Sequence, residues 1–121
     1  MLPRAKMNEE QPFSVRCEQR DGAAVVVVTG EVDMSTSPML REGLRAPEAQ
    51  AETVVLDLRA VTFMDSSGLG AIVGQHKRAR EHGFRFAVAV GGAAGVERIL
   101  ALAQLTQVLE IVQSPDDALP G

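Results

Sequence analysis

The chain has 121 residues, of which 45% are hydrophobic and 23% are charged. This length and composition are typical of one compact domain, because a chain of this size can bury about two-thirds of its surface on folding. A single Cys excludes a disulfide framework within the chain, and one Cys with two His offers too few soft ligands for a zinc centre, so we expect no metal and no cofactor. The net charge of −4 and the absence of Trp and Tyr argue against nucleic-acid binding, which relies on basic surfaces and aromatic stacking.

Residues 1–11 are polar and show no hydrophobic period, so we expect a disordered lead before a single domain at residues 12–121. This lead lacks the apolar stretch of a signal peptide, and no apolar run in the chain approaches the roughly 20 residues that span a bilayer. We therefore expect a cytoplasmic protein without a membrane segment.

The domain is expected to open with a β-hairpin. Residues 13–18 alternate apolar and polar side chains, as a half-buried strand does. Asp21-Gly22 is a turn signal, and residues 23–29 follow as a nearly continuous apolar run. The run of valines predicts that the second strand lies inside the sheet.

A helix is expected to start within residues 34–38, Met-Ser-Thr-Ser-Pro, because Ser and Thr are good N-caps and Pro fits the first helical turn. Leu40 and Leu44 are four residues apart and predict its buried face, while Pro47 marks its end. Residues 53–58 are again largely apolar and predict a third strand.

Residues 65–70 combine small and polar side chains between a strand and a helical pattern. Asp65 or Ser66 is predicted as the N-cap of a helix that runs to about His82 and is closed by Gly83 in the left-handed conformation. The expected apolar face of this helix consists of Leu69, Ile72, Val73 and His76.

The remaining elements complete an α/β pattern. We expect a strand at residues 84–90, a helix at 94–102, a short strand at 108–112 and a last helix opening at 114–119. Strands separated by helices predict a small, mixed, mostly parallel sheet of four to five strands, with helices mainly on one face and part of the other face exposed. Val27, Leu56 and Val88 are expected in its core.

The Asp-Ser-Ser-Gly segment at residues 65–68 has the composition of a helix N-cap, and this structural role is its simplest interpretation. A hydrolase nucleophile normally appears as Gly-x-Ser-x-Gly with His and acid partners. Both histidines of this chain fall in or next to one predicted helix, and His76 is interpreted as a helix-face residue. A catalytic triad is therefore disfavoured.

Other polar positions also have structural interpretations. The Gly91-Gly92 pair lacks the Gly-Lys-Ser/Thr ending of a phosphate-binding loop, which favours a flexible loop over the alternative of a small nucleotide-binding enzyme. Glu31 and Asp33 are interpreted as part of a solvated loop rather than a catalytic pair. Cys17 is interpreted as a small core residue.

Residues 63–70, Phe-Met-Asp-Ser-Ser-Gly-Leu-Gly, follow Gly-Glu-Val-Asp at residues 30–33 and the valine-rich strands, and together they resemble the STAS family. Within it, the chain is similar to stand-alone bacterial anti-sigma factor antagonists of the SpoIIAA and RsbV type, over about residues 13–119. The resemblance implies the STAS fold, which agrees with the element order.

The resemblance implies a partner-switching protein and not an enzyme. In the family, the first serine of the Asp-Ser-Ser-Gly motif is phosphorylated by an ATP-dependent serine/threonine kinase that is also the anti-sigma factor, and this position is Ser66 here. The unphosphorylated antagonist binds the anti-sigma factor and releases the sigma factor. Phosphorylation abolishes this binding, and a PP2C-type serine phosphatase restores it.

The surface that contacts the partner is expected around this motif. The expected residues are Glu31, Asp33, Asp65, Ser67, Gly68 and Leu69, and Ser67 is the second serine, which is not the usual acceptor. We expect the chain to be a monomer or a weak dimer. The alternative within the family is a STAS scaffold or sensor subunit in which Ser66 is not phosphorylated.

Overall fold

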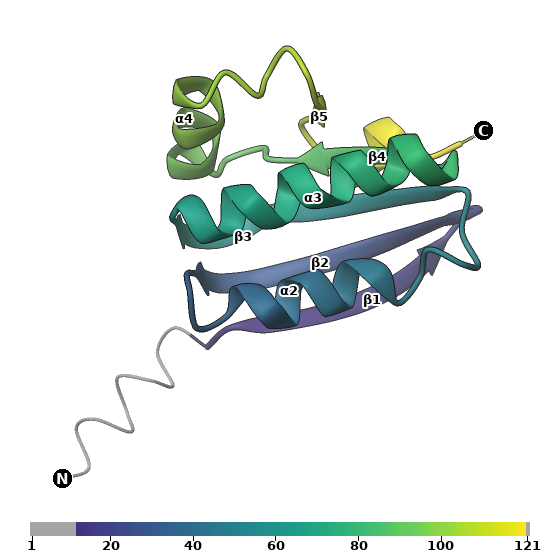
Figure 1. The fold of residues 1–121 in the computed structure, drawn as a ribbon, viewed down its shortest axis with the longest axis horizontal. Helices are drawn as coiled ribbons and strands as arrows, with labels where there is room; N and C mark the ends of the chain where they lie inside the picture. The colour runs from purple at the N-terminus through teal and green to yellow at the C-terminus, as the bar shows by residue number, and fades with distance from the viewer. Residues whose placement is uncertain (1–11, 121) are drawn as a thin grey trace, which may run out of the picture.

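The computed structural model describes residues 12–120, in which one five-stranded sheet is covered by α-helices (Figure 1). The disordered lead expected at residues 1–11 lies outside the described residues. No helix within residues 12–120 is long and apolar enough to cross a membrane. In chain order the elements are β1 (Ser14–Arg20), β2 (Ala23–Val32), α2 (Ser37–Arg45), β3 (Thr53–Met64), α3 (Ser66–His82), β4 (Arg85–Ala89), α4 (Ala94–Leu102), β5 (Glu110–Val112) and the 3-10 turn η1 (Pro115–Ala118).

The strands lie in the sheet in the same order as in the chain, β1-β2-β3-β4-β5. β1 is antiparallel to β2, and the other three pairs are parallel. Each parallel pair is joined by one crossover, and crossovers of one hand that all step in the same direction place their segments on one face. The expected mixed, mostly parallel sheet with helices on one side is confirmed.

The main core lies between the sheet and its helices. Leu40 and Leu44 of α2 are buried as expected, and Leu56 lies beside Val88 in the β3–β4 register with both side chains fully buried. α4 contributes Val96 to the same cluster. α3 contributes Ile72, so this core joins α2, α3 and α4 to one face of the sheet.

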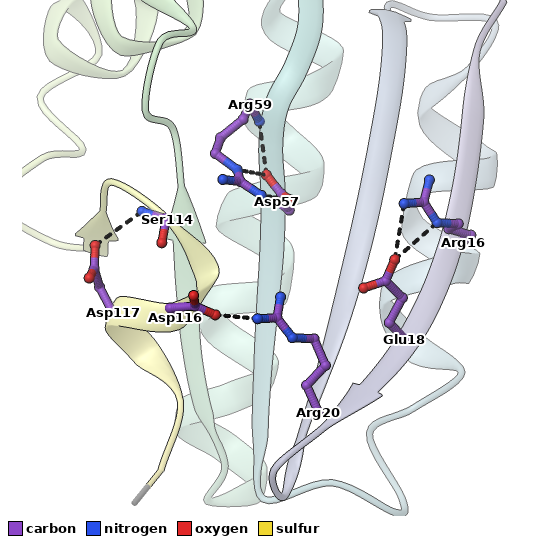
Figure 2. Close-up of polar contacts among 8 residues, drawn as sticks. All are labelled: Arg16, Glu18, Arg20, Asp57, Arg59, Ser114, Asp116 and Asp117. Atoms are coloured by element: carbon purple, nitrogen blue, oxygen red, sulfur yellow. Dashed lines mark hydrogen bonds and ion pairs between the residues drawn. The ribbon is translucent and has the colours of Figure 1, made fainter.

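The opposite face of the sheet is only partly covered. Its small apolar cluster contains Val25 and Val55 under η1, with Val27 half-buried at its margin. Val27, Leu56 and Val88 lie in the adjacent strands β2, β3 and β4 as expected, but Val27 is outside the main core because strand alternation turns Val26 toward the helices instead. Figure 2 shows that the rest of this face carries charged side chains. The short last helix expected at residues 114–119 is found there as the 3-10 turn η1.

Asp57 is the buried charge of this face. Its carboxylate accepts hydrogen bonds from Arg59 Nε at 2.9 Å and Nη2 at 3.0 Å, and also from the Arg59 backbone N–H at 3.1 Å (Figure 2). The paired guanidinium compensates for the burial of the carboxylate within an otherwise apolar strand. The pair lies where β3 changes from its buried first half to its more exposed second half.

The β1–β2 hairpin turns at Asp21 and Gly22, which have φ values of 49° and 86°. Two consecutive residues with positive φ are typical of the type I′ turn that matches the twist of a two-residue hairpin, so the Asp-Gly prediction is confirmed. Cys17 lies on the outer strand of this hairpin and is exposed. Its expected place in the core is therefore wrong, because β1 has no neighbour beyond its outer edge.

Both β2 and β3 continue further than their sequences predict. β2 reaches Val32 and β3 reaches Met64, where the expected ends are residues 29 and 58. Val61 and Met64 are buried in the main core, so tertiary packing keeps this more polar stretch extended. Gly30 lies within β2 with φ 90°, and a Cβ there would lie 2.4 Å from the carbonyl oxygen of Pro12, so only glycine fits.

α3 begins and ends as predicted, with Asp65 as N-cap and Gly83 as a left-handed C-cap. Its buried face differs from the expected one and consists of Gly68, Ala71, Ile72, Gln75 and Ala79. Leu69, Val73 and His76 are only half-buried. Gly68 lets the first turn of the helix rest on Met64 and Val32, and this contact turns the Gly68–Ala71–Ile72 side of α3 toward the core.

Leu56→Ala is expected to lower the free energy of unfolding by about 2–5 kcal/mol, because it leaves a cavity at a fully buried position. Leu102→Ala is the matched control, since Leu102 is 73% exposed and its truncation should change stability by less than about 0.5 kcal/mol. Urea denaturation measures both variants, and equal losses would contradict the assigned core.

Candidate functional site

Two loops meet at the carboxyl ends of β2 and β3. The parallel pairing shifts register twice, between Val27 and Thr29 and between Gly30 and Glu31, and continues to the last residues of both strands, where Val32 lies beside Met64. The backbone N–H of Asp65 donates a hydrogen bond to the Val32 carbonyl oxygen at 3.1 Å. The segments after the two strands, including Asp33 and Asp65, are therefore held next to each other.

The start of α3 is fixed by Asp65. Its backbone is extended, and its Oδ1 accepts a hydrogen bond from the Ser67 backbone N–H at 2.8 Å. Its carbonyl oxygen accepts from the backbone N–H groups of Gly68 at 3.1 Å and Leu69 at 3.3 Å. One side chain thus satisfies a free donor of the first helical turn, as an N-cap residue does.

The two serines of the motif differ in exposure. Ser66 is the first residue of α3 and is exposed, whereas Ser67 is half-buried. The first turn of a helix carries a partial positive charge and unsatisfied N–H groups, which favour an anion there. Of the two hydroxyls, that of Ser66 is the more accessible to another protein.

The loop after β2 is organised around Asp33. Its Oδ1 accepts hydrogen bonds from the Ser35 hydroxyl at 2.7 Å and from the backbone N–H groups of Ser35 at 2.9 Å and Thr36 at 3.2 Å. The hydrogen bond from the Ser35 hydroxyl is the main reason that the pKa of Asp33 is lowered. Asp33 thus stays ionised at neutral pH in a fixed position.

Thr36 closes the same loop. Its hydroxyl donates to the Glu31 carbonyl oxygen at 2.9 Å and accepts from the Asp33 backbone N–H at 2.9 Å. Glu31 itself is an exposed residue of β2, so its expected place in a loop is wrong, because β2 runs on to Val32. Asp33 and Asp65 line one shallow depression together with Met34 and Ser35.

Two large apolar side chains at the ends of β2 and β3 are exposed, and Met34 lines the depression together with Asp33 and Asp65. Met34 is 79% exposed, and Phe63, which lies beside Glu31 in the β2–β3 register, is 50% exposed. Neither residue is among those expected at the site from the sequence. Both are large apolar residues next to polar motif residues in the sequence, and this pattern could have indicated that they belong to the site. Fixed acidic groups next to exposed apolar groups form a surface suited to another protein.

The last two expected site residues are placed differently from Ser66. Gly68 is buried, and a Cβ there would lie 2.6 Å from Met64 Cγ and 2.9 Å from Val32 Cγ1. Glycine therefore lets the first turn of α3 rest on the ends of both strands. Leu69 is half-buried and packs against the main core.

The other candidate chemistries gain no support from the described residues. No group of three or more His, Cys, Asp or Glu residues within residues 12–120 could hold a metal ion. The Gly91 backbone N–H, which a phosphate loop would need, donates to the Gln113 carbonyl oxygen at 2.9 Å. A Cβ on Gly91 would lie 2.4 Å from that oxygen, so this glycine serves the close approach of two backbone segments.

A family model described as the STAS domain matches residues 14–118. The chain belongs to the STAS domain family. The anti-sigma F factor antagonist of Paenibacillus polymyxa is 35% identical to this STAS domain over 111 residues, which cover 88% of this chain and 92% of that protein. The family match covers all five strands and includes the Asp-Ser-Ser-Gly segment described above.

Solved structures agree with this assignment. The crystal structure of an anti-sigma factor antagonist from Mycobacterium paratuberculosis is 31% identical, with a TM-score of 0.80 over 88% of this chain and 91% of that chain. The Bacillus cell fate determinant SpoIIAA in its phosphorylated form is 17% identical, with a TM-score of 0.65 over 87% of this chain and 96% of that chain, and it shares the fold. This STAS domain therefore has relatives of nearly full length that are named anti-sigma factor antagonists.

Gly68→Ala is expected to lower the thermal midpoint by an amount equivalent to about 1–3 kcal/mol, because its methyl group would overlap Met64 and Val32. Gly95→Ala is the control: a Cβ there meets nothing within 4 Å, and alanine in helix α4 should be neutral or stabilising by up to about 1 kcal/mol. A midpoint of Gly68→Ala at or above that of the wild type would contradict the packing assigned to α3.

Proposed function

We propose that this STAS domain is an anti-sigma factor antagonist, without enzymatic activity, whose binding to an anti-sigma factor kinase is switched off by phosphorylation of Ser66. The observation that carries the proposal is the exposure of Ser66 at the start of α3, beside fixed carboxylates and exposed apolar side chains. The relatives named anti-sigma factor antagonists support the regulatory role, and the Asp-Ser-Ser-Gly motif supports the residue. On this proposal the chain acts in the cytoplasm, where sigma factors meet RNA polymerase.

The proposed modification is a phosphoryl transfer from ATP. The Ser66 oxygen forms a bond to the γ-phosphorus while the bond from that phosphorus to the β–γ bridging oxygen breaks, ADP leaves, and the hydroxyl proton passes to a base of the kinase. A PP2C-type phosphatase reverses the change by transferring the phosphoryl group to water. The STAS domain is the substrate in both reactions and supplies only an accessible hydroxyl.

The domain itself should tolerate the phosphate. Phosphorylation adds about −1.5 to −2 charges at neutral pH, and the first turn of α3 is a favourable place for negative charge. Asp65 already satisfies the Ser67 backbone N–H, so the cap does not depend on the Ser66 hydroxyl. The fold of the phosphorylated protein is therefore expected to match that of the unmodified one.

The bound partner should not tolerate it. A partner that packs on Met34 covers the depression lined by Asp33 and Asp65, and it must bring its own atoms close to the Ser66 hydroxyl that follows Asp65. A phosphate there would be desolvated beside like charges and would separate the apolar surfaces. Such juxtaposition costs several kcal/mol, which corresponds to an affinity loss of a few hundredfold or more.

The second candidate is a STAS scaffold or sensor subunit that binds partners through the same surface without modification of Ser66. The exposed apolar pair Met34 and Phe63 suits this role equally well. The two candidates differ in one observable, since only the first requires a phosphorylated serine.

Ser66→Ala is expected to prevent phosphorylation and to keep the protein bound to its anti-sigma factor when ATP is present. Ser67→Ala is the matched control and should still accept one phosphate, although loss of its half-buried side chain costs some stability. Incubation with candidate anti-sigma kinases and ATP, followed by mass spectrometry of peptides, measures the site. If Ser66→Ala still carries phosphate at the wild-type level, another residue is the phosphorylation site. If the wild-type protein binds the kinase but stays unmodified, the scaffold or sensor role is favoured.

Ser66→Asp is expected to weaken anti-sigma binding in part while the thermal midpoint stays near that of the wild type. A carboxylate in the first turn of α3 favours the helix by about 0.3–1 kcal/mol, but it carries less charge and bulk than a phosphate. The loss of affinity should become smaller at higher ionic strength. Calorimetric titration and melting curves test this, and a fall in midpoint that parallels the loss of affinity would instead indicate a conformational mechanism.

A further inference from the structure

β1 forms an open edge of the sheet. It has seven residues, contains no proline, and pairs with β2 through an unbroken register from Ser14 to Arg20 (Figure 1). The backbone groups on its outer side have no strand to pair with among residues 12–120. Long, regular edge strands of this kind are templates for pairing with another strand.

We propose that β1 pairs with β1 of a second copy of this chain, antiparallel about a two-fold axis at Cys17, so that the two five-stranded sheets form one continuous sheet in a weak symmetric dimer. This dimer would form at the β1 edge of the sheet, and it does not depend on the proposed function. The loops with Asp33 and Asp65 lie at the carboxyl ends of β2 and β3, and they remain exposed in such a dimer.

The order of residues in β1 selects one register. In symmetric antiparallel pairing, only an axis at Cys17 pairs all of residues 14–20, and it places Arg16 opposite Glu18 of the second copy and Glu18 opposite Arg16. An axis at residue 16 or 18 would place two like charges directly opposite each other and leave part of the strand unpaired. Opposite charges across a strand pair are stabilising and like charges are destabilising, so the longest pairing is also the complementary one.

The charges concerned are already arranged on one face. Figure 2 shows Arg16 and Glu18 on the same side of β1, where Arg16 Nη2 lies 3.0 Å from Glu18 Oε2. Their side chains remain 60% and 38% exposed, so both can interact with a second pair. In the proposed dimer the four charges alternate in sign, and each one gains a neighbour of opposite charge.

The other face of the same edge carries an apolar groove. It is lined by Phe13, Val15, Met39, Gly43 and Ala46, together with Ser14 and Glu42. Val15 fits under α2 because Gly43 has no side chain, since a Cβ there would lie 2.5 Å from Val15 Cγ1. A second β1 strand alongside would cover part of this groove, which adds apolar contact to the backbone hydrogen bonds.

The affinity is expected to be low, because one pair of short strands buries less surface than a standard protein interface of about 1,200–2,000 Å². Sedimentation velocity of the full chain with reductant, at concentrations up to about 1 mM, should therefore show a reversible monomer–dimer equilibrium. A single monomeric species over the whole range would overturn the proposal.

Charge exchange tests the register. Arg16→Glu and Glu18→Arg should each raise the dissociation constant at least tenfold, and the double variant Arg16→Glu/Glu18→Arg should restore it to within about threefold of wild type, because opposite charges face each other again. Arg98→Glu changes the net charge equally on an exposed position of α4 and should leave the equilibrium unchanged. A double variant as weak as the single variants, or a control as weak, would overturn the proposed pairing.

Cys17 provides an independent readout. Facing Cβ atoms in an antiparallel pair lie about 4.5–5.5 Å apart, which is close to the geometry of a disulfide. The azo oxidant diamide takes two electrons and two protons from two Cys17 thiols and is reduced to the hydrazine, and non-reducing electrophoresis detects the covalent dimer. Trapping should be fast in the wild type and absent in Cys17→Ser.

The single charge variants separate pairing from thiol reactivity. Desolvation by burial and, second, the charge of Glu18 raise the pKa of Cys17. Glu18→Arg is therefore expected to make the thiolate more abundant, whereas Arg16→Glu adds a neighbouring negative charge, which disfavours the thiolate. If reactivity alone governed trapping, the two variants would change its rate in opposite directions. The proposed dimer requires both variants to trap more slowly and the double variant to recover, and opposite changes would overturn it.

Discussion

Parallel pairing of β2 with β3 continues to the last residue of both strands, where Val32 lies beside Met64. Because both strands end at the same level, the segment after β2 and the segment after β3 leave the sheet next to each other. The hydrogen bond from the Asp65 N–H to the Val32 carbonyl joins the two exits, and Gly68 lets α3 rest directly on them. The relative positions of both acidic loops therefore follow from the register of one strand pair.

Capping of the helix and exposure of a hydroxyl are assigned to two different residues, Asp65 and Ser66. The carboxylate of Asp65 caps α3, and the hydroxyl of Ser66 is left exposed. A change in charge at Ser66 can then alter an interface without loss of the cap on which the helix depends. Asp33, held by its own loop, keeps the neighbouring surface negative whatever the state of α3.

Local chemistry made much of the fold predictable from the sequence. Asp65 and Gly83 define the ends of α3 through their own backbone preferences, and the Asp-Gly turn defines the hairpin. Features that depend on distant contacts were not predictable. The extension of β3 depends on burial of Val61 and Met64, and the buried face of α3 depends on the contact of Gly68 with the ends of β2 and β3. At the site, the motif located the loop, but only the sheet register shows which side chains adjoin it. Cys17 is exposed because β1 is an edge strand of the sheet, and no local sequence pattern predicts the position of a strand in its sheet.

The agreement between strand order and chain order has a consequence for synthesis on the ribosome. Each strand pairs with the one made just before it, so the growing chain can extend the sheet one unit at a time. No later strand has to insert between two that are already paired. Until β3 emerges, however, the valine-rich β2 has only β1 as a partner. A nascent chain that has made only this hairpin therefore exposes its most apolar strand.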